Sequence, residues 1–159
     1  EALLEAFIEQ VQGLEQKLGC LLIQLPPSLA LDAGVAQGFF RQLRQVYPGG
    51  AALEPRHSSW FNPAADYLLQ DFAIARAVAD PPILEPTPPG GDQRLVYFRL
   101  HGQPRMYYSS YTERQLEAYA ERLRAAAQQA AACWCMFDNT AAGAAIENAL
   151  SLMQNLRRL

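Results

Sequence analysis

The sequence has little of several features that mark particular protein classes. It contains only three cysteines, an odd number, in 159 residues, which does not fit the disulfide framework of a small secreted domain. No apolar run approaches the roughly 20 residues that a transmembrane helix needs. The net charge is only −3, so no strong positive field draws the chain to nucleic acid. Buried free thiols in a reducing compartment are the simplest interpretation, and we expect a cytoplasmic protein.

Several catalytic signatures are also missing. The sequence has no Walker loop, no GxGxxG and no GxSxG, which disfavours nucleotide hydrolases, dinucleotide-binding folds and serine hydrolases. It has no HxH or HExxH pair that would point to a metal site. Half of the residues are hydrophobic and 18% are charged, as in an average globular protein. We therefore expect a single folded domain over residues 1–159.

Helical and strand-like patterns alternate along the chain. Short apolar strands are predicted at 21–25, 51–54, 73–79, 95–100 and 132–137, and helices at 3–18, 32–47, 63–71, 112–129 and 142–156. Asn62 before Pro63 is a helix start, and Thr112 with Gln115 forms a capping box. The segment 81–92 is rich in proline and glycine and is predicted to be a loop.

This order of elements predicts an α/β fold. Strands that are apolar on both faces are typical of a parallel sheet covered by helices. An open doubly wound sheet and a closed barrel both fit, and periodicity alone does not separate them.

Polar side chains gather where the predicted strands end. They are Gln24, Glu54, Arg56, His57, Asp80, Arg99, His101, Asp138 and Asn139. Ligands bind at the carboxyl ends of the strands in barrels and in doubly wound sheets, so these residues form a candidate site. The alternative is that they are satisfied ion pairs, such as Glu54–Arg56 or Arg76–Asp80, which only fill the end of the sheet.

Side-chain alternation divides these residues between two faces. In the strand at 95–100, Val96, Phe98 and Leu100 should face the helices, while Arg99 and His101 lie on the opposite face. By the same alternation, we expect Arg76, Val78 and Asp80 to share one face of the strand at 73–79.

Five sequence blocks resemble the YecE-like domain of unknown function, number seventy-two in that series. The blocks lie at 22–28, 54–61, 79–81, 97–102 and 137–145, and they include Arg-Leu-His-Gly and Arg-His-Ser-Ser-Trp-Phe. The resemblance implies a TIM-barrel-like (β/α) parallel barrel and supplies no reaction. Five strands would be its C-terminal part, with the N-terminal strands absent. We therefore expect a longer native polypeptide, or another chain, to complete the barrel.

The strand-end residues suggest an anion site. Asp138 and Asn139 lead into a predicted helix whose first turn, Ala141 to Ala144, has small side chains that leave backbone N–H groups accessible. Arg56 and Arg99 could add charge-assisted contacts. Gln24, Arg56, Arg99, Asp138, Asn139 and Gly143 are the predicted ligand-binding residues.

The same strand ends carry groups for acid–base chemistry. Glu54 or Asp80 is the predicted base, and His57 or His101 is the predicted acid. The two histidines, together with Glu54, Asp80 and Asp138, could instead hold a divalent metal ion. Only the types of these residues support that interpretation, because their spacing matches no metal-binding motif.

Our leading hypothesis is an enzyme, a hydrolase, isomerase or lyase, that acts on a small anionic or phosphorylated ligand. A non-catalytic binding or regulatory module is the first alternative. Metal-assisted phosphodiester or nucleic-acid chemistry is the second, and the acidic balance of the chain disfavours it.

Overall fold

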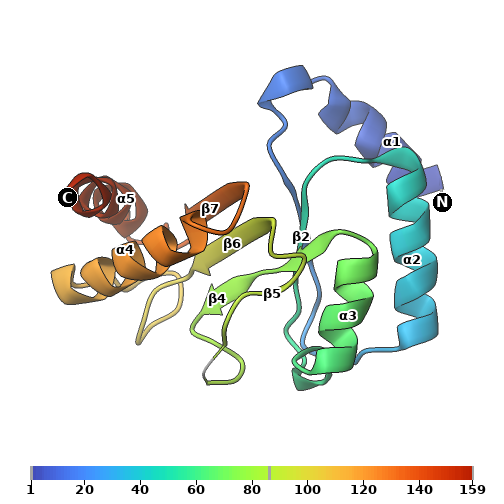
Figure 1. Ribbon diagram of the computed structural model, residues 1–159. Helices are drawn as coiled ribbons and strands as arrows, with labels where there is room; N and C mark the ends of the chain where they lie inside the picture. The colour runs from blue at the N-terminus through green and yellow to red at the C-terminus, as the bar shows by residue number, and fades with distance from the viewer. Residues whose placement is uncertain (1, 86, 159) are drawn as a thin grey trace. The chain divides into compact units, whose positions relative to one another are not determined.

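The computed structural model describes residues 2–85 and 87–158, which form a mixed α/β fold of helices and mostly parallel strands (Figure 1). The chain divides into two compact units. Unit 1 contains the chain up to Arg76 together with Gly90–Asp92, and unit 2 contains Ala77–Pro89 and the chain from Gln93 onward. Each unit has its own sheet and its own hydrophobic core, so each is described separately.

Unit 1 is built on a four-stranded sheet. Its strands are β1 (Leu21–Gln24), β2 (Ala51–Glu54), β3 (Ile74–Arg76) and β5 (Gly90–Gly91), in that order. The first three are parallel and β5 is antiparallel to β3. The strand β5 lies in the segment 81–92, for which the sequence predicted only a loop. The structure corrects that prediction. At Gly91 φ is 63°, and a Cβ there would collide with the Ile74 backbone oxygen, which explains why glycine pairs with β3 at this position.

The helices of unit 1 are α1 (Ala2–Gln12), the 3₁₀ turns η1 (Glu15–Lys17) and η2 (Ser58–Trp60), α2 (Ala33–Val46) and α3 (Pro63–Asp71). The prediction of a helix start at Asn62 is confirmed, because its side chain accepts a hydrogen bond from the Ala65 N–H. The helix predicted over 3–18 ends earlier, before Gly13, a residue with low helix propensity. Phe40, Leu53 and Trp60 are buried in the core of this unit.

Unit 2 is built on three parallel strands. These are β4 (Val78–Asp80), β6 (Leu95–Leu100) and β7 (Ala132–Phe137), in the order β4-β6-β7. Helices α4 (Glu113–Ala127) and α5 (Ala144–Arg157) complete the unit, and the predicted capping box at Thr112 is confirmed. Phe98 and Leu100 pack with α4 residues such as Leu116 in the core, as the alternation predicted.

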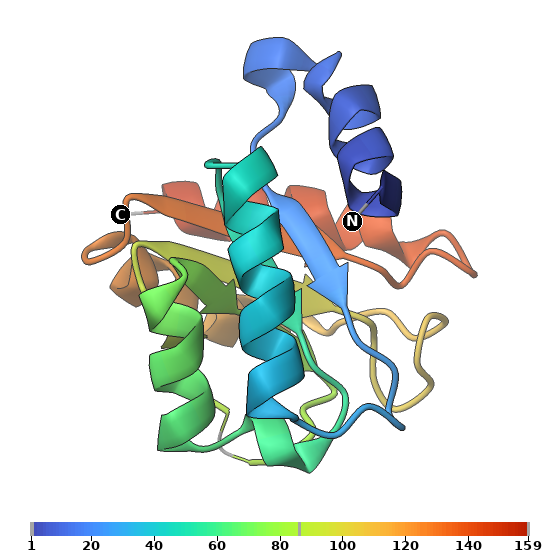
Figure 2. The same ribbon diagram turned by 90° about the vertical axis from the view of Figure 1, so that its right-hand side faces the viewer.

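The predicted strand 73–79 is two strands. Residues 74–76 belong to the sheet of unit 1, and residues 78–80 belong to the sheet of unit 2. The expected alternation from Arg76 through Val78 to Asp80 is therefore wrong, because Arg76 and Asp80 do not lie in one continuous strand. Within unit 1, Figure 2 shows helices α2 and α3 side by side.

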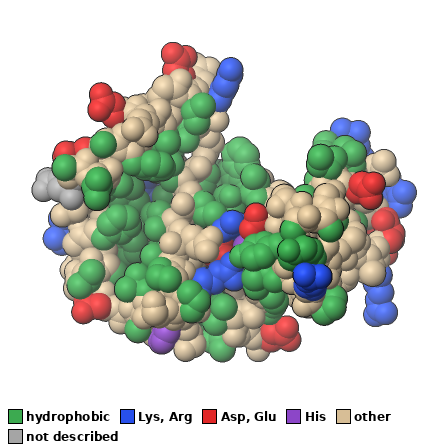
Figure 3. Space-filling model, turned by 180° about the vertical axis from the view of Figure 1, so that it is seen from behind, with side chains coloured by type: hydrophobic (Ala, Val, Ile, Leu, Met, Phe, Trp, Pro, Cys, Tyr) green, Lys and Arg blue, Asp and Glu red, His purple; other side chains and the backbone are tan. Residues whose placement is uncertain are grey.

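The described strands form two open sheets, so the closed barrel remains a prediction. Among the described strands, β7 is an edge strand that pairs only with β6, and it exposes Trp134 and Met136. Exposed hydrophobic side chains are visible over the surface in Figure 3. None of the described helices is both long and apolar enough to cross a membrane.

Candidate functional site

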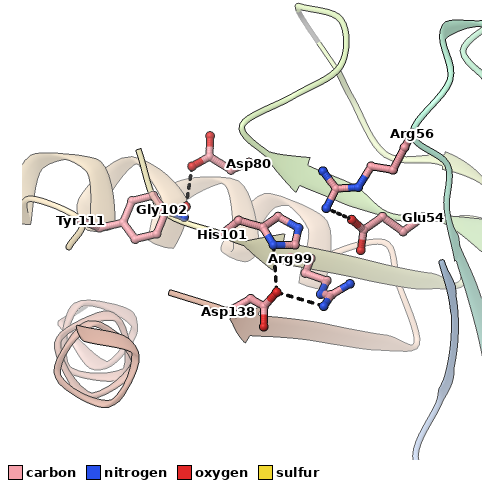
Figure 4. Close-up of polar contacts among 8 residues, drawn as sticks. All are labelled: Glu54, Arg56, Asp80, Arg99, His101, Gly102, Tyr111 and Asp138. Atoms are coloured by element: carbon pink, nitrogen blue, oxygen red, sulfur yellow. Dashed lines mark hydrogen bonds and ion pairs between the residues drawn. The ribbon is translucent and has the colours of Figure 1, made fainter. Parts of the chain in front are cut away.

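The predicted site residues are divided between the two units. Gln24, Glu54, Arg56 and His57 belong to unit 1, and Asp80, Arg99, His101, Asp138, Asn139 and Gly143 belong to unit 2. Figure 4 draws the polar contacts within both groups.

Three of the predicted residues in unit 2 meet at one carboxylate. The Asp138 Oδ2 atom accepts a hydrogen bond from Arg99 Nη2 at 3.0 Å and one from His101 Nδ1 at 2.9 Å (Figure 4). The strand register brings them together, because β7 lies beside β6 and the Asp138 N–H donates to the Leu100 carbonyl at 2.8 Å. The His101 side chain is buried, whereas the side chains of Arg99 and Asp138 are 18% and 31% exposed.

This contact fixes the state of the His101 ring. A carboxylate only accepts hydrogen bonds, so Nδ1 carries a proton and Nε2 holds the lone pair when the ring is neutral. The ring is held from a second side by Tyr107, whose ring lies edge-on at 5.6 Å between centroids. The contacts with Asp138 and Tyr107 hold the His101 imidazole in one orientation, so Nε2 is the atom at which the ring can gain and lose a proton.

Asp80 is not brought to this carboxylate. Its Oδ2 atom accepts a hydrogen bond from the Tyr111 hydroxyl at 2.5 Å, and Gln103 donates to its other oxygen. In Figure 4 the Asp80 side chain points away from Asp138. Burial, and next the hydrogen bond to Asp80, raise the pKa of Tyr111 far above its usual value. Asp80 therefore binds the segment between β6 and α4 through Tyr111 and Gln103. These contacts do not favour the role of base that the sequence suggested.

Asn139 and Gly143 also serve the fold. The Asn139 Nδ2 group donates to the Ser109 carbonyl and to Asn148 Oδ1. The helix predicted over 142–156, with a first turn at 141–144, begins later than predicted, because α5 begins at Ala144 and Gly143 precedes it with φ of 77°. The Gly143 N–H donates to the Thr140 carbonyl within this turn, so the predicted cradle of N–H groups at 141–144 does not form as a first helical turn.

Sequence reasoning missed Asn148. It is buried on α5, and its Oδ1 atom accepts from the Tyr111 N–H at 3.0 Å. Its side-chain amide also donates to Ser110 Oγ. The available signal was an asparagine in a predicted helix, where its propensity is low.

In unit 1, Glu54 and Arg56 form the ion pair that was the alternative to a functional role. Glu54 Oε1 and Arg56 Nη2 are 2.5 Å apart, and the side chains are 0% and 9% exposed. Gln24 pairs in register with Glu54 across β1 and β2 and is exposed. The other suggested ion pair is wrong, because Arg76 binds Asp66 rather than Asp80.

His57 has a local structural role. Its Nδ1 atom accepts a hydrogen bond from the Ser59 N–H at 3.2 Å and lies 2.9 Å from the Ser59 hydroxyl. It thereby caps η2. The turn that places His57 is fixed by these neighbours in sequence, and they account for its side-chain contacts.

The described residues contain no group of three or more His, Cys, Asp and Glu side chains placed to hold a metal ion. The three cysteines are free. Burial raises the pKa of Cys20 to about 11 and that of Cys135 to about 12. Such thiols stay protonated at neutral pH and are poor nucleophiles and poor metal ligands.

Comparison with known proteins places this geometry in a family. The model of the family described as "Protein of unknown function DUF72" matches residues 1–159. A crystal structure of a DUF72 family protein from Thermotoga maritima has a TM-score of 0.85 and 25% identity, over 98% of this chain and 65% of that chain. One from Enterococcus faecalis has a TM-score of 0.81 and 20% identity, over 98% and 66%. This chain thus spans less than two thirds of the Thermotoga protein's length. No curated protein matches it.

Proposed function

Since the chain belongs to the DUF72 family, whose description names no activity, we propose a function from the site itself: unit 2 binds a small anionic or phosphorylated ligand, and His101 exchanges a proton with it. The observation that supports this proposal is the single Asp138 oxygen shared by Arg99 and His101.

Each member of this cluster has a distinct role. Arg99 supplies a guanidinium, whose planar fork of N–H donors matches carboxylates and phosphates. Asp138 orients the His101 ring with its proton on Nδ1, so we assign proton exchange to Nε2. The ring is fully buried, so the ligand has to displace neighbouring side chains to reach this atom. When His101 is protonated, the cluster of Arg99, His101 and Asp138 carries a net charge of about +1, which favours an anion.

The cluster lies where the fold favours a ligand. Arg99 is near the carboxyl end of β6, His101 follows that strand and Asp138 follows β7. Ligands of α/β proteins bind at this end of parallel strands. We also propose that the parallel strands belong to a TIM-barrel-like fold.

A non-catalytic binding module is the second candidate. It is favoured by the engagement of the carboxylates, since Glu54 is paired with Arg56 and Asp80 accepts hydrogen bonds from Tyr111 and Gln103. A general base among them would first have to give up these contacts. The two candidates share the anion site and differ only in whether His101 transfers a proton during turnover.

Calorimetric titration with inorganic phosphate tests the shared site. We expect saturable binding by the protein, and a loss of affinity of about tenfold or more in Arg99→Gln, because a charge-assisted hydrogen bond is removed. The control is Arg114→Gln, which removes the same charge from an exposed position at the start of α4. Equal affinity in all three proteins would refute the assignment of Arg99.

A second experiment separates an enzyme from a binding module. Mixtures of sugar phosphates and small carboxylic acids are incubated with the protein and followed by ³¹P and ¹H NMR. An enzyme should convert one component, and His101→Gln should abolish conversion while phosphate still binds. If no component that binds is converted, the binding module is favoured.

A further inference from the structure

A cavity lies within unit 2, on the side of the sheet that faces α4. Its volume is about 1010 Å³, and residues of β4, β6, α4 and the proline-rich segment 81–89 line it. Sites for small molecules usually enclose about 300–1,000 Å³. The cavity is therefore large enough for one small ligand.

The connection between β4 and β6 explains why the cavity exists. Parallel strands are usually joined by a helix that covers one face of the sheet. Here the described residues between β4 and β6, which leave out only residue 86, contain β5 and no helix. Prolines at 82, 88 and 89 line the space instead.

The sheet side of the cavity and part of its helix side are apolar, and polar residues such as Gln93 and Gln129 line the rest. Val78, Val96 and Phe98 form the buried sheet side. On α4, Ala125 and Ala126 are small and leave room beside Tyr119. This lining suits an aromatic or aliphatic group of a ligand.

Arg122 supplies a positive charge at this apolar lining. Its guanidinium carbon is 5.1 Å from the centroid of the Phe98 ring and 5.3 Å from that of Tyr119, so two aromatic rings hold it in place. No salt bridge or side-chain hydrogen bond joins Arg122 to an acceptor anywhere in residues 2–85 and 87–158. Its N–H donors are therefore available to an anionic group.

Two carboxylates also line the cavity. Asp80 is 6% exposed, and its two oxygens already accept hydrogen bonds from Tyr111 and Gln103. Glu85 is exposed to solvent on the proline-rich segment. Glu85 and Arg122 are both exposed to solvent, but hydrogen bonds satisfy Asp80 and two aromatic rings orient Arg122 at the cavity. Arg122 is therefore the group that we expect to select the charge of a ligand.

We propose that this cavity is a binding site for a small amphipathic carboxylate, with the carboxylate on Arg122 and the apolar group beside Tyr119, Ala125 and the sheet. The proposal does not depend on the strand-end cluster of Arg99, His101 and Asp138.

The test uses 3-phenylpropanoate as the probe and ¹H–¹⁵N NMR of the protein as the readout. We expect saturable shifts at residues of α4 and at the non-proline residues 83–85 and 87, with affinity reduced about tenfold or more in Arg122→Gln. Arg99→Gln should bind the probe as the unchanged protein does, which separates this cavity from the strand-end site.

A matched pair of alanine variants tests the location. Ala125→Phe places a ring in the cavity and should abolish binding, whereas Ala127→Phe adds the same ring to an exposed residue of α4 that does not line it. 3-Phenylpropylamine serves as the cationic counterpart and should bind more weakly than the acid.

Three outcomes would overturn the proposal. The first is an absence of saturable shifts with the unchanged protein at about 10 mM probe, which corresponds to affinity too weak for a specific site. The second is equal affinity in Arg122→Gln or in folded Ala125→Phe. The third is preference for the amine, which would mean that Asp80 and Glu85 set the charge selectivity.

Discussion

His101 donates its Nδ1–H to Asp138 at 2.9 Å, whereas the other histidine, His57, accepts at Nδ1 from the Ser59 N–H at 3.2 Å. The two rings therefore differ in which nitrogen carries the proton when they are neutral. We predict the Nδ1–H tautomer for His101 and the Nε2–H tautomer for His57. Long-range ¹H–¹⁵N NMR above pH 8 distinguishes them, because the protein has only two histidines. The same tautomer in both rings would contradict one of these contacts.

The Glu54–Arg56 ion pair should contribute to stability mainly through the cost of breaking it. Arg56→Met leaves Glu54, which is fully buried, without the partner that lies 2.5 Å away. We expect the free energy of unfolding to fall by about 3–5 kcal/mol, as for other buried pairs that lose one member. Urea unfolding measures the loss. The double variant Glu54→Gln with Arg56→Met should be more stable than Arg56→Met alone, and a lower stability would argue against the pair.

Tyr111 should be a structural residue. Its hydroxyl donates to Asp80 and accepts from the Gly102 N–H at 2.8 Å. Tyr111→Phe removes both hydrogen bonds and should lower the free energy of unfolding by about 1–3 kcal/mol, because buried polar groups lose a partner. Tyr108→Phe is the control, because Tyr108 is exposed, and it should change stability by less than about 0.5 kcal/mol. Equal losses in the free energy of unfolding for the two variants, measured by urea unfolding, would contradict a structural role for the Tyr111 hydroxyl.

Stability should fall in alkaline solution. Burial raises the pKa of Cys20 from 9.0 to about 11 and that of Cys135 from 9.0 to about 12. Above pH 9 the unfolded chain releases these protons while the folded protein keeps them, so unfolding becomes more favourable as pH rises through this range. Urea unfolding at pH 8 and at pH 10.5 measures the difference. Cys135→Ala should lose less stability over this interval than the unchanged protein, and an equal loss would show that Cys135 does not contribute.

Local patterns predicted much of the fold. The strands at 95–100 and 132–137 and the helix caps at Asn62 and Thr112 could be read from the sequence, because neighbouring residues determine them. The two faces of β6 were also correct, since Phe98 enters the core and Arg99 lies on the side of Asp138.

Long-range contacts decided what the sequence did not show. Arg76 was assigned to one strand with Asp80, but its ion pair with Asp66 and the close approach of Gly90 place it in another sheet. The helix predicted over 142–156 begins later, at Ala144, because Gly143 adopts a left-handed conformation, which glycine takes at little cost. The hydrogen bond between Tyr111 and Asp80 joins residues that are far apart in the sequence, so the spacing of residues alone could not predict it.

The most direct test of the strand-end site follows the two histidine rings by NMR as inorganic phosphate is added. If Arg99, His101 and Asp138 bind an anion, the His101 ring signals should shift saturably, while those of His57, which caps η2, serve as the internal reference and stay in place. Arg99→Gln should weaken the His101 response about tenfold or more. A response from His57 alone, or from neither ring, would contradict the account.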